Sequence, residues 1–320
     1  MKLLFIFTGG TIGSTNENGV ISPDAGKPYL LLEKYTERHP VDFIYDTLAL
    51  MNELSENFTG DHIARILCAV NENAAKYDGI IVTHGTDTLS YTAAALGYAM
   101  GNESIPVCLV SSAYPLEDTR ENGVENLFGA ISLIRHGTEK GVFVPYQNEK
   151  RGSVTIHRAT RLSSSLAFLH QIYSVNDTYY GTVDADGVFR KNPDFHEEPD
   201  AAPPPEWYSL RERSRGVLRI QPYPGMVYPP FPDVPRAVLL DTFHSSTIEG
   251  KSHATHAFLK AAQKKEIPVF VTGNAAYESA KIFDEYDVVR LPLSPIAAYM
   301  KLWLYGADAD LSLSRGGDVF

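Results

Sequence analysis

The sequence predicts an α/β protein built from two α/β domains, and three observations lead to that prediction. Short apolar segments alternate along the chain with segments of helical periodicity, and each short segment is apolar throughout. This pattern is typical of a parallel sheet covered by helices on both faces. The length of 320 residues is more than one compact core usually contains. The 44% of apolar and 21% of charged residues are those of a globular protein with a sizeable core.

The larger domain is expected over residues 1–190, with a parallel sheet that ends in an antiparallel margin. Asp186-Gly187 between two short apolar pairs predicts a hairpin at that margin. Helices are predicted where apolar residues recur on one face. The predicted elements are, in order, a strand at Lys2–Phe7, a helix containing Leu30–Tyr35, a helix containing Ile63–Val70, a strand at Gly79–Val82, a helix at Ser90–Met100, a strand at Ile105–Val110, a helix at about Asn122–Arg135, a strand at Val142–Tyr146 and the hairpin over Thr182–Phe189.

The smaller domain follows a polar segment rich in proline. Residues 191–206 contain five prolines, which fit poorly inside a helix or strand. We therefore place a linker at residues 191–213 and the second domain at residues 214–320. There the alternation restarts, with strands expected at Gly216–Ile220, Ala237–Leu240 and Ile267–Val271 and helices at about His253–Lys264 and Pro295–Leu304.

Charge and targeting features narrow the class of protein. The net charge of −11, without any basic run, argues against a nucleic-acid partner. Cys68 and Cys108 lie in apolar stretches, which fits buried, reduced thiols better than a disulfide framework. The apolar run Leu3–Phe7 is too short for a signal peptide, and no segment approaches the roughly 20 apolar residues of a membrane span. We therefore expect a soluble, cytoplasmic protein with no membrane partner.

Two loops rich in glycine and threonine follow predicted strands, at the strand ends where α/β proteins bind ligands. The first is Thr8-Gly9-Gly10-Thr11-Ile12-Gly13. Paired glycines let backbone N–H groups converge on an anion, and Thr11 adds a hydroxyl at the same point. A dinucleotide-binding loop is the alternative, because Gly10 and Gly13 match the last two glycines of GxGxxG, although Thr8 stands where the first glycine is required.

The second loop is His84-Gly85-Thr86-Asp87-Thr88. As an N-cap of the following helix, Asp87 or Thr88 has a purely structural explanation. The adjacent Thr86 and Asp87 also have a chemical one. A threonine hydroxyl is a nucleophile once a base takes its proton, and a carboxylate can hold the ammonium group of an amino acid.

These two loops, with Thr11 and Thr86 75 positions apart, resemble the signature motifs TGGTIG and HGTDT of the bacterial L-asparaginase family, with the cytoplasmic type I members most similar. The resemblance implies a smaller, flavodoxin-like C-terminal domain and an amidohydrolase without metal or cofactor that releases ammonia from L-asparagine or a related small amino acid. It implies that Thr11 is the nucleophile, that Thr86 and Asp87 are catalytic and that Asp87 binds the substrate ammonium. It further implies a homodimer or homotetramer, in which a neighbouring subunit helps to build each site.

Other parts of the predicted site depend on the same resemblance. Ser55 and Glu56, in Ser-Glu-Asn-Phe, match the segment whose serine holds the substrate α-carboxylate. Backbone N–H groups around Gly10 and Thr86 are expected to stabilise the oxyanion.

Three departures from the family pattern bear on activity. Arg161 stands at the position of the family's catalytic lysine, and a guanidinium stays charged and cannot serve as a base. Val20 replaces the tyrosine of the flexible loop, for which Tyr29 is a candidate substitute. The segment Asp241–Thr247 replaces a Gly-rich loop, which implies altered substrate choice or regulation.

Two further functions therefore remain open. One is a catalytically weak or inactive homologue that binds a small amino acid as a sensor, and the other is a nucleotide-binding protein. A metal site is not expected, because His253 and His256 are one helical turn apart but have no evident third ligand.

Overall fold

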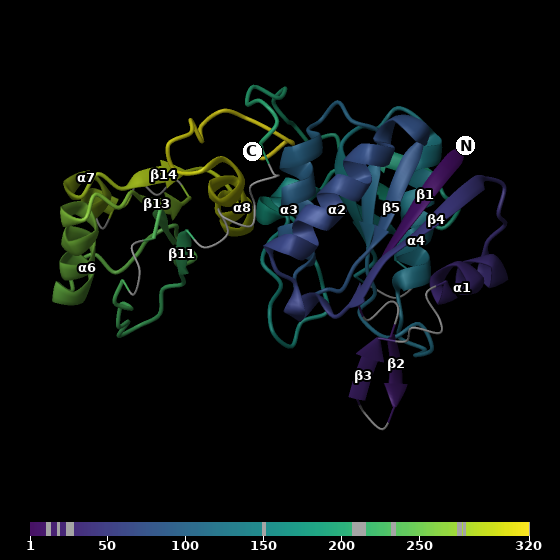
Figure 1. The fold of residues 1–320 in the computed structure, drawn as a ribbon, viewed down its shortest axis with the longest axis horizontal. Helices are drawn as coiled ribbons and strands as arrows, with labels where there is room; N and C mark the ends of the chain where they lie inside the picture. The colour runs from purple at the N-terminus through teal and green to yellow at the C-terminus, as the bar shows by residue number, and fades with distance from the viewer. Residues whose placement is uncertain are drawn as a thin grey trace.

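A computed structural model describes the protein over residues 1–10, 29–148, 152–206, 216–231, 235–273, 277 and 280–319, with the backbone of 14–17 and 20–23. Two α/β units of unequal size lie side by side (Figure 1). The larger unit has an eight-stranded sheet and the smaller one a four-stranded sheet. The predicted fold class is therefore confirmed. The predicted linker extends past residue 206, outside the described residues, so its bounds remain a prediction.

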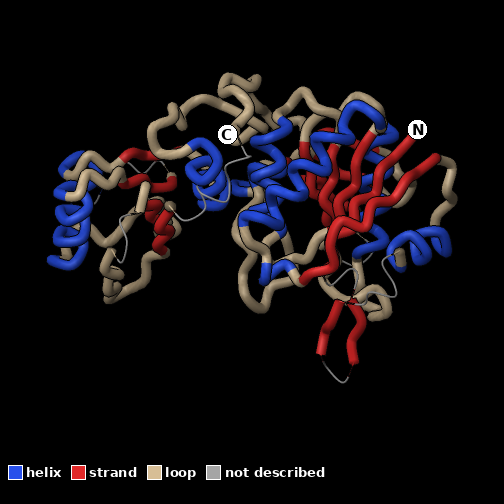
Figure 2. Tube along the Cα trace, viewed as in Figure 1, coloured by secondary structure: helices blue, strands red, loops and turns tan. Residues whose placement is uncertain are grey.

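The larger sheet is parallel over five strands and antiparallel at one margin, as expected from its sequence pattern. Figure 2 shows its strands in red, flanked by helices. The antiparallel strands are the three that come last in the sequence among the strands of this sheet. In spatial order the sheet consists of β10 (Phe189–Lys191), β9 (Gly181–Val183), β8 (Val154–Arg158), β7 (Val142–Tyr146), β6 (Val107–Val110), β5 (Gly79–Thr83), β1 (Lys2–Gly9) and β4 (Ile44–Glu53).

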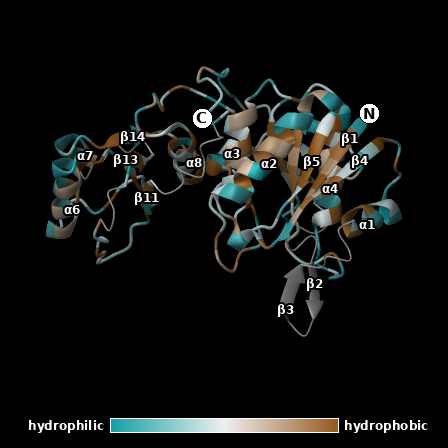
Figure 3. Cartoon of the chain, in the orientation of Figure 1, coloured by the Kyte–Doolittle hydropathy of each residue, from teal (hydrophilic) through white to brown (hydrophobic). Residues whose placement is uncertain are grey.

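Helices cover both faces of this sheet. Successive side chains of a strand point to opposite faces, and in the central strands both sets are apolar, so each face needs a covering layer. Leu4 and Ile6 of β1 pack with one pair of helices, and Leu3 and Phe5 pack with the other pair. Figure 3 shows the apolar colouring concentrated on the central strands and on the helix faces that pack against them. The first pair is α2 (Gly60–Asn73) and α3 (Leu89–Met100), and the second is α1 (Leu30–Arg38) and α4 (Gly123–His136).

Several elements were not predicted. Strand β4 lies at the edge of the sheet, and most of its residues are exposed or only half-buried, so its sequence lacks a continuous apolar run. Strand β8 lies in the antiparallel margin. A separate hairpin is formed by β2 (Ser14–Glu17) and β3 (Val20–Pro23), and single 3₁₀ turns occur at Ser55–Asn57, Ala74–Lys76, Ala159–Arg161 and Val175–Asp177.

The smaller unit continues the alternation of strands and helices. Its four strands are parallel and lie in chain order. The short strand β14 and the short helix α7 were not predicted. The elements are β11 (Val217–Ile220), β12 (Ala237–Leu240), α6 (His253–Lys264), β13 (Val269–Thr272), α7 (Lys281–Glu285), β14 (Val289–Leu291) and α8 (Pro295–Tyr305).

Helix α8 joins the two units. It lies between them in Figure 1, and Ile296, Ala297 and Met300 share one hydrophobic core with α3. Tyr98 Oη of α3 donates to the Ala297 carbonyl of α8 at 3.2 Å, and the rings of Tyr91 in α3 and Tyr299 in α8 lie 5.8 Å apart. Helix α3 thus contacts the smaller unit directly. Among the described residues, no helix is long and apolar enough to cross a membrane.

Candidate active site

The ends of β1 and β5 bring the two glycine-rich loops together. The strands pair in parallel, so both loops leave the same edge of the sheet. Thr8 Oγ1 donates a hydrogen bond to the Thr83 carbonyl at 2.5 Å. Beyond this bond, Gly10 and Gly85 approach so closely that a Cβ on Gly10 would lie 2.5 Å from Gly85 N. The loops therefore meet at Gly10, which has φ +80°, while Thr11 lies outside the described residues.

Ser55 reaches this meeting point from a third direction. It begins the 3₁₀ turn after β4 and is only 1% exposed. A Cβ on Gly85 would lie 2.5 Å from Ser55 Oγ, and Thr88 Oγ1 donates to the Ser55 carbonyl at 2.8 Å. Ser55 Oγ has no hydrogen-bond partner among the described residues. Its hydroxyl is therefore buried beside the second loop and makes no hydrogen bond to a described residue. Glu56, the next residue, is exposed.

His84 holds the second loop from the protein interior. Its Nδ1 donates to the Gly85 carbonyl at 2.7 Å, and its Nε2 accepts from Thr92 Oγ1 at 2.8 Å. Burial lowers the pKa of His84 to about 4, against the smaller opposing effect of the Gly85 carbonyl. The imidazole is therefore neutral at pH 7 and fixes Gly85 beside Gly10 and Ser55.

Thr86 and Asp87 line a small pocket just before α3. Thr86 is half-buried and Asp87 is exposed, and Thr88 is the N-cap residue but makes no capping bond with its side chain. The pocket has a volume of about 60 Å³. Asp87 is thus open to a ligand. The residues that line the pocket are Thr86, Asp87, Ala113, Tyr146, Ser165, Leu166, Leu169, His170, Gln171 and Ile172.

The opposite wall of this pocket was missed by sequence reasoning. This wall is the segment Ser165–Ile172, and two hydrogen bonds hold it in place. Ser165 Oγ donates to the Thr86 carbonyl at 3.3 Å, and Tyr146 Oη donates to the His170 carbonyl at 2.6 Å. The run of serines and apolar residues in this segment carries no known motif, so only the fold places it here.

Arg161 does not line the Thr86–Asp87 pocket, and its guanidinium contacts the C-terminal segment. Arg161 is only 1% exposed. Arg161 Nε donates to the Gly317 carbonyl at 2.6 Å, and Nη2 donates to the carbonyls of His196 at 2.6 Å and Val319 at 2.8 Å. Burial lowers the pKa of Arg161 to about 10, which leaves it charged at neutral pH. These hydrogen bonds hold the C-terminal segment in place.

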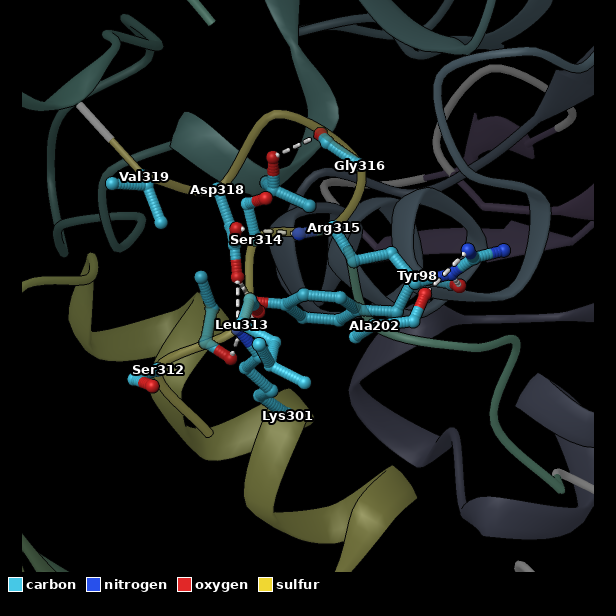
Figure 4. Close-up of polar contacts among 12 residues, drawn as sticks. Tyr98, Ala202, Lys301, Ser312, Leu313, Ser314, Arg315, Gly316, Asp318 and Val319 are labelled. Atoms are coloured by element: carbon cyan, nitrogen blue, oxygen red, sulfur yellow. Dashed lines mark hydrogen bonds and ion pairs between the residues drawn. The ribbon is translucent and has the colours of Figure 1, made fainter. Parts of the chain in front are cut away.

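The C-terminal segment 314–319 is held by a buried polar network between the two units (Figure 4). Arg315 Nε donates to the Tyr98 carbonyl at 2.7 Å, and Arg315 Nη1 donates to the Ala202 carbonyl at 2.9 Å. The Gly316 N–H donates to Asp200 Oδ1 at 2.7 Å. The bond to Tyr98 attaches the C-terminal segment to the far end of α3, the helix that begins at the Thr86–Asp87 loop, and the other two attach it to residues 200–202.

The remaining sequence candidates lie elsewhere or outside the described residues. Tyr29 packs edge-on against Phe7, with ring centroids 5.2 Å apart, and lines a separate surface depression with Tyr45. The side chain of Val20 lies outside the described residues. His256 pairs with Tyr286 Oη at 2.9 Å, and no group of three or more potential metal ligands occurs in the described part of the chain.

Comparisons with known proteins match the chain to one family. Residues 2–194 match the family model described as Asparaginase, N-terminal. The chain is 33% identical over 150 residues to the L-asparaginase of Thermococcus kodakarensis, which covers 47% of this chain and 45% of that protein. It is 30% identical over 170 residues to the 60 kDa lysophospholipase of Mus musculus, which covers 46% of this chain and 30% of that protein.

The fold matches solved structures over nearly the whole chain. The structure of the thermostable L-asparaginase from Thermococcus kodakarensis superposes with a TM-score of 0.75 at 25% identity, over 100% of this chain and 99% of that chain. The sequence alignments are shorter than this structural match. They span less than half the length of each of these two curated relatives.

Proposed function

The chain belongs to the asparaginase family, and we propose that it is an amidohydrolase acting on the side-chain amide of L-asparagine or of a related small amino acid. The products are the corresponding acid and ammonia. The family match covers residues 2–194, and we propose this activity for the whole chain.

The observation that carries this proposal is the buried hydroxyl of Ser55. It lies beside Gly85, where the first and second loops meet, and no described residue satisfies it. A buried hydroxyl without a partner is costly, so a ligand that accepts its hydrogen bond gains the full value of that bond. The α-carboxylate of an amino acid is such a ligand, and exposed Asp87 on the same loop offers a charge for the ammonium group.

The proposed reaction is the one that the family resemblance implies. Thr11 attacks the amide carbon, ammonia leaves, and water then releases the acid from the threonine ester. Thr86 is the second catalytic threonine, Asp87 holds the substrate ammonium, and Glu56 flanks Ser55 at the carboxylate end. The Gly10 N–H already donates to the Glu53 carbonyl at 2.9 Å, so the oxyanion donors must come from other backbone groups around Gly10 and Thr86.

A second function is binding of a small amino acid without efficient turnover. Arg161 favours it, because its guanidinium stays charged and donates to the C-terminal segment. Proton transfer by a lysine at this position would then be absent, while Ser55 and Asp87 would still bind a ligand.

We also propose a cytoplasmic location and a homodimer or homotetramer. Cys68 and Cys108 are both free thiols, and Cys108 is buried. Free thiols are typical of proteins in reducing compartments. The exposed apolar side chains Leu166, Phe168 and Leu169 near the pocket provide a surface for association. Sedimentation at micromolar concentration tests the assembly, and a strictly monomeric chain would contradict it.

An ammonia-release panel tests the function. The substrates are L-asparagine, L-glutamine, D-asparagine and β-aspartyl-glycine, and the matched variant is Thr11→Val, which removes one hydroxyl. Turnover by the wild type that the variant lacks supports the amidohydrolase. Calorimetric binding of L-aspartate without turnover supports the sensor, and neither turnover nor binding would reject both.

A further inference from the structure

The smaller unit carries a charged pair that reaches across to the pocket walls. Arg219 of β11 binds Asp241, the residue after β12, with Nε 3.0 Å from Oδ1 and Nη2 2.7 Å from Oδ2. The side chains are 19% and 8% exposed. A two-pronged pair of this kind fixes the plane of the guanidinium. In this orientation Nη1 and Nη2 of Arg219 reach residues of the larger unit.

Arg219 contacts both structures that flank the Thr86–Asp87 pocket. Nη1 donates to Tyr91 Oη at 2.6 Å, and Tyr91 belongs to the first turn of α3. Nη2 donates to Ser164 Oγ at 3.4 Å. Ser164 precedes Ser165, whose hydroxyl bonds to the Thr86 carbonyl. One guanidinium therefore links the helix that follows Asp87 to the segment that forms the opposite wall.

We infer that Arg219, oriented by Asp241, is a positioning residue that sets the separation of these two pocket walls and so controls substrate affinity. The inference rests on the proposed function, because the affinity in question is that for the amino-acid substrate. Asp241 belongs to the segment that departs from the type I pattern. Its role is to orient Arg219 of the same chain. Arg219 does not line the pocket itself, so its effect must pass through Tyr91 and Ser164.

Two variants weaken the link while retaining the charge balance at Asp241. Tyr91→Phe removes only the hydroxyl that Arg219 contacts. Arg219→Lys keeps a cation beside Asp241 but loses the planar fork that serves Asp241 and Tyr91 together. Tyr299→Phe is the matched control, because the Tyr299 ring packs on Tyr91 at 5.8 Å but its hydroxyl has no hydrogen bond to Arg219 among the contacts of the described residues.

Steady-state ammonia release from L-asparagine provides the first readout. Both test variants should raise KM about three- to tenfold, the effect of one hydrogen bond, with kcat within twofold of wild type. The double variant should raise KM no further than the larger single effect, because both changes remove the same link. An unchanged KM in both single variants, or an equal rise in Tyr299→Phe, would overturn the inference.

Hydrogen exchange of the unliganded protein provides a second readout that is independent of catalysis. Amides of residues 163–173 and 86–92 should exchange faster in Tyr91→Phe and Arg219→Lys than in wild type and Tyr299→Phe. If wild type releases no ammonia, the proposed amidohydrolase fails but this comparison still decides the positioning role. Identical exchange in all four proteins would reject that role.

Discussion

Lys301 Nζ lies 2.6 Å from Asp318 Oδ2, and both side chains are buried, at 1% and 0% exposure. Lys301 belongs to α8 of the smaller unit, while Asp318 belongs to the C-terminal segment (Figure 4). Asp318 also accepts hydrogen bonds from Tyr98 Oη of α3 at 3.1 Å and from the Arg315 N–H at 2.9 Å. The carboxylate of Asp318 thus ties the end of the chain to a helix of each unit.

Lys301→Met should lower the free energy of unfolding by about 3 kcal/mol, because Asp318 would remain buried without its cation. Urea denaturation at pH 7 measures the change. Lys260→Met, at an exposed lysine of α6, is the control and should change stability by less than about 0.5 kcal/mol. Equal losses in the two variants would show that the buried pair has no special role.

Arg161→Lys should destabilise the protein by about 1–3 kcal/mol without raising kcat. Lysine has a single nitrogen and cannot serve the carbonyls of His196, Gly317 and Val319 together, so at least one buried carbonyl would lose its bond. Thermal unfolding and ammonia release from L-asparagine are measured on the same preparation. A higher kcat with unchanged stability would instead mean that the side chain at position 161 takes part in proton transfer, which lysine can perform and arginine cannot.

Stability should fall as the pH drops below about 6.5, in part because of His84. Burial lowers its pKa to about 4 in the folded protein from an ordinary value of 6.5. Between these values the unfolded chain binds a proton that the folded chain does not, so folding loses about 1.4 kcal/mol per pH unit from this group. Above pH 6.5 the contribution of His84 to stability is fully retained.

The pH slope of unfolding free energy in His84→Gln tests this assignment. Urea denaturation at several values between pH 4.5 and 6 should show a slope smaller than that of wild type by about 1.4 kcal/mol per pH unit. Replacement of the exposed His253 by glutamine serves as the control and should keep the wild-type slope. A wild-type slope in His84→Gln would refute the assignment.

The parallel core of the fold was predictable because its strands are buried on both faces and read as continuous apolar runs. Strand β4 was missed for the complementary reason: it lies at the sheet edge, and its residues are mostly exposed or half-buried. In the site, the close approach of Gly10 and Gly85 follows from two loops at one sheet edge. By contrast, the Arg161 contacts depend on residues 156 and 158 positions away, which no local pattern encodes.

Ser55→Ala should weaken substrate binding without weakening the fold. Ser55 Oγ has no described hydrogen-bond partner, so its removal breaks no known bond, and the thermal midpoint should stay within about 2 °C of wild type. A hydrogen bond to a charged group contributes about 1.5–3 kcal/mol, so the Kd for L-aspartate should rise roughly 10- to 100-fold by calorimetry. Ser132→Ala is the matched control, because Ser132 Oγ in α4 is also buried without a described partner but lies beside Gly187, where a Cβ would be 3.2 Å from it, and not beside Gly85. It should leave the Kd unchanged. A Kd unaffected by Ser55→Ala would place the substrate carboxylate elsewhere, and a large loss of stability would mean that the hydroxyl serves the fold instead.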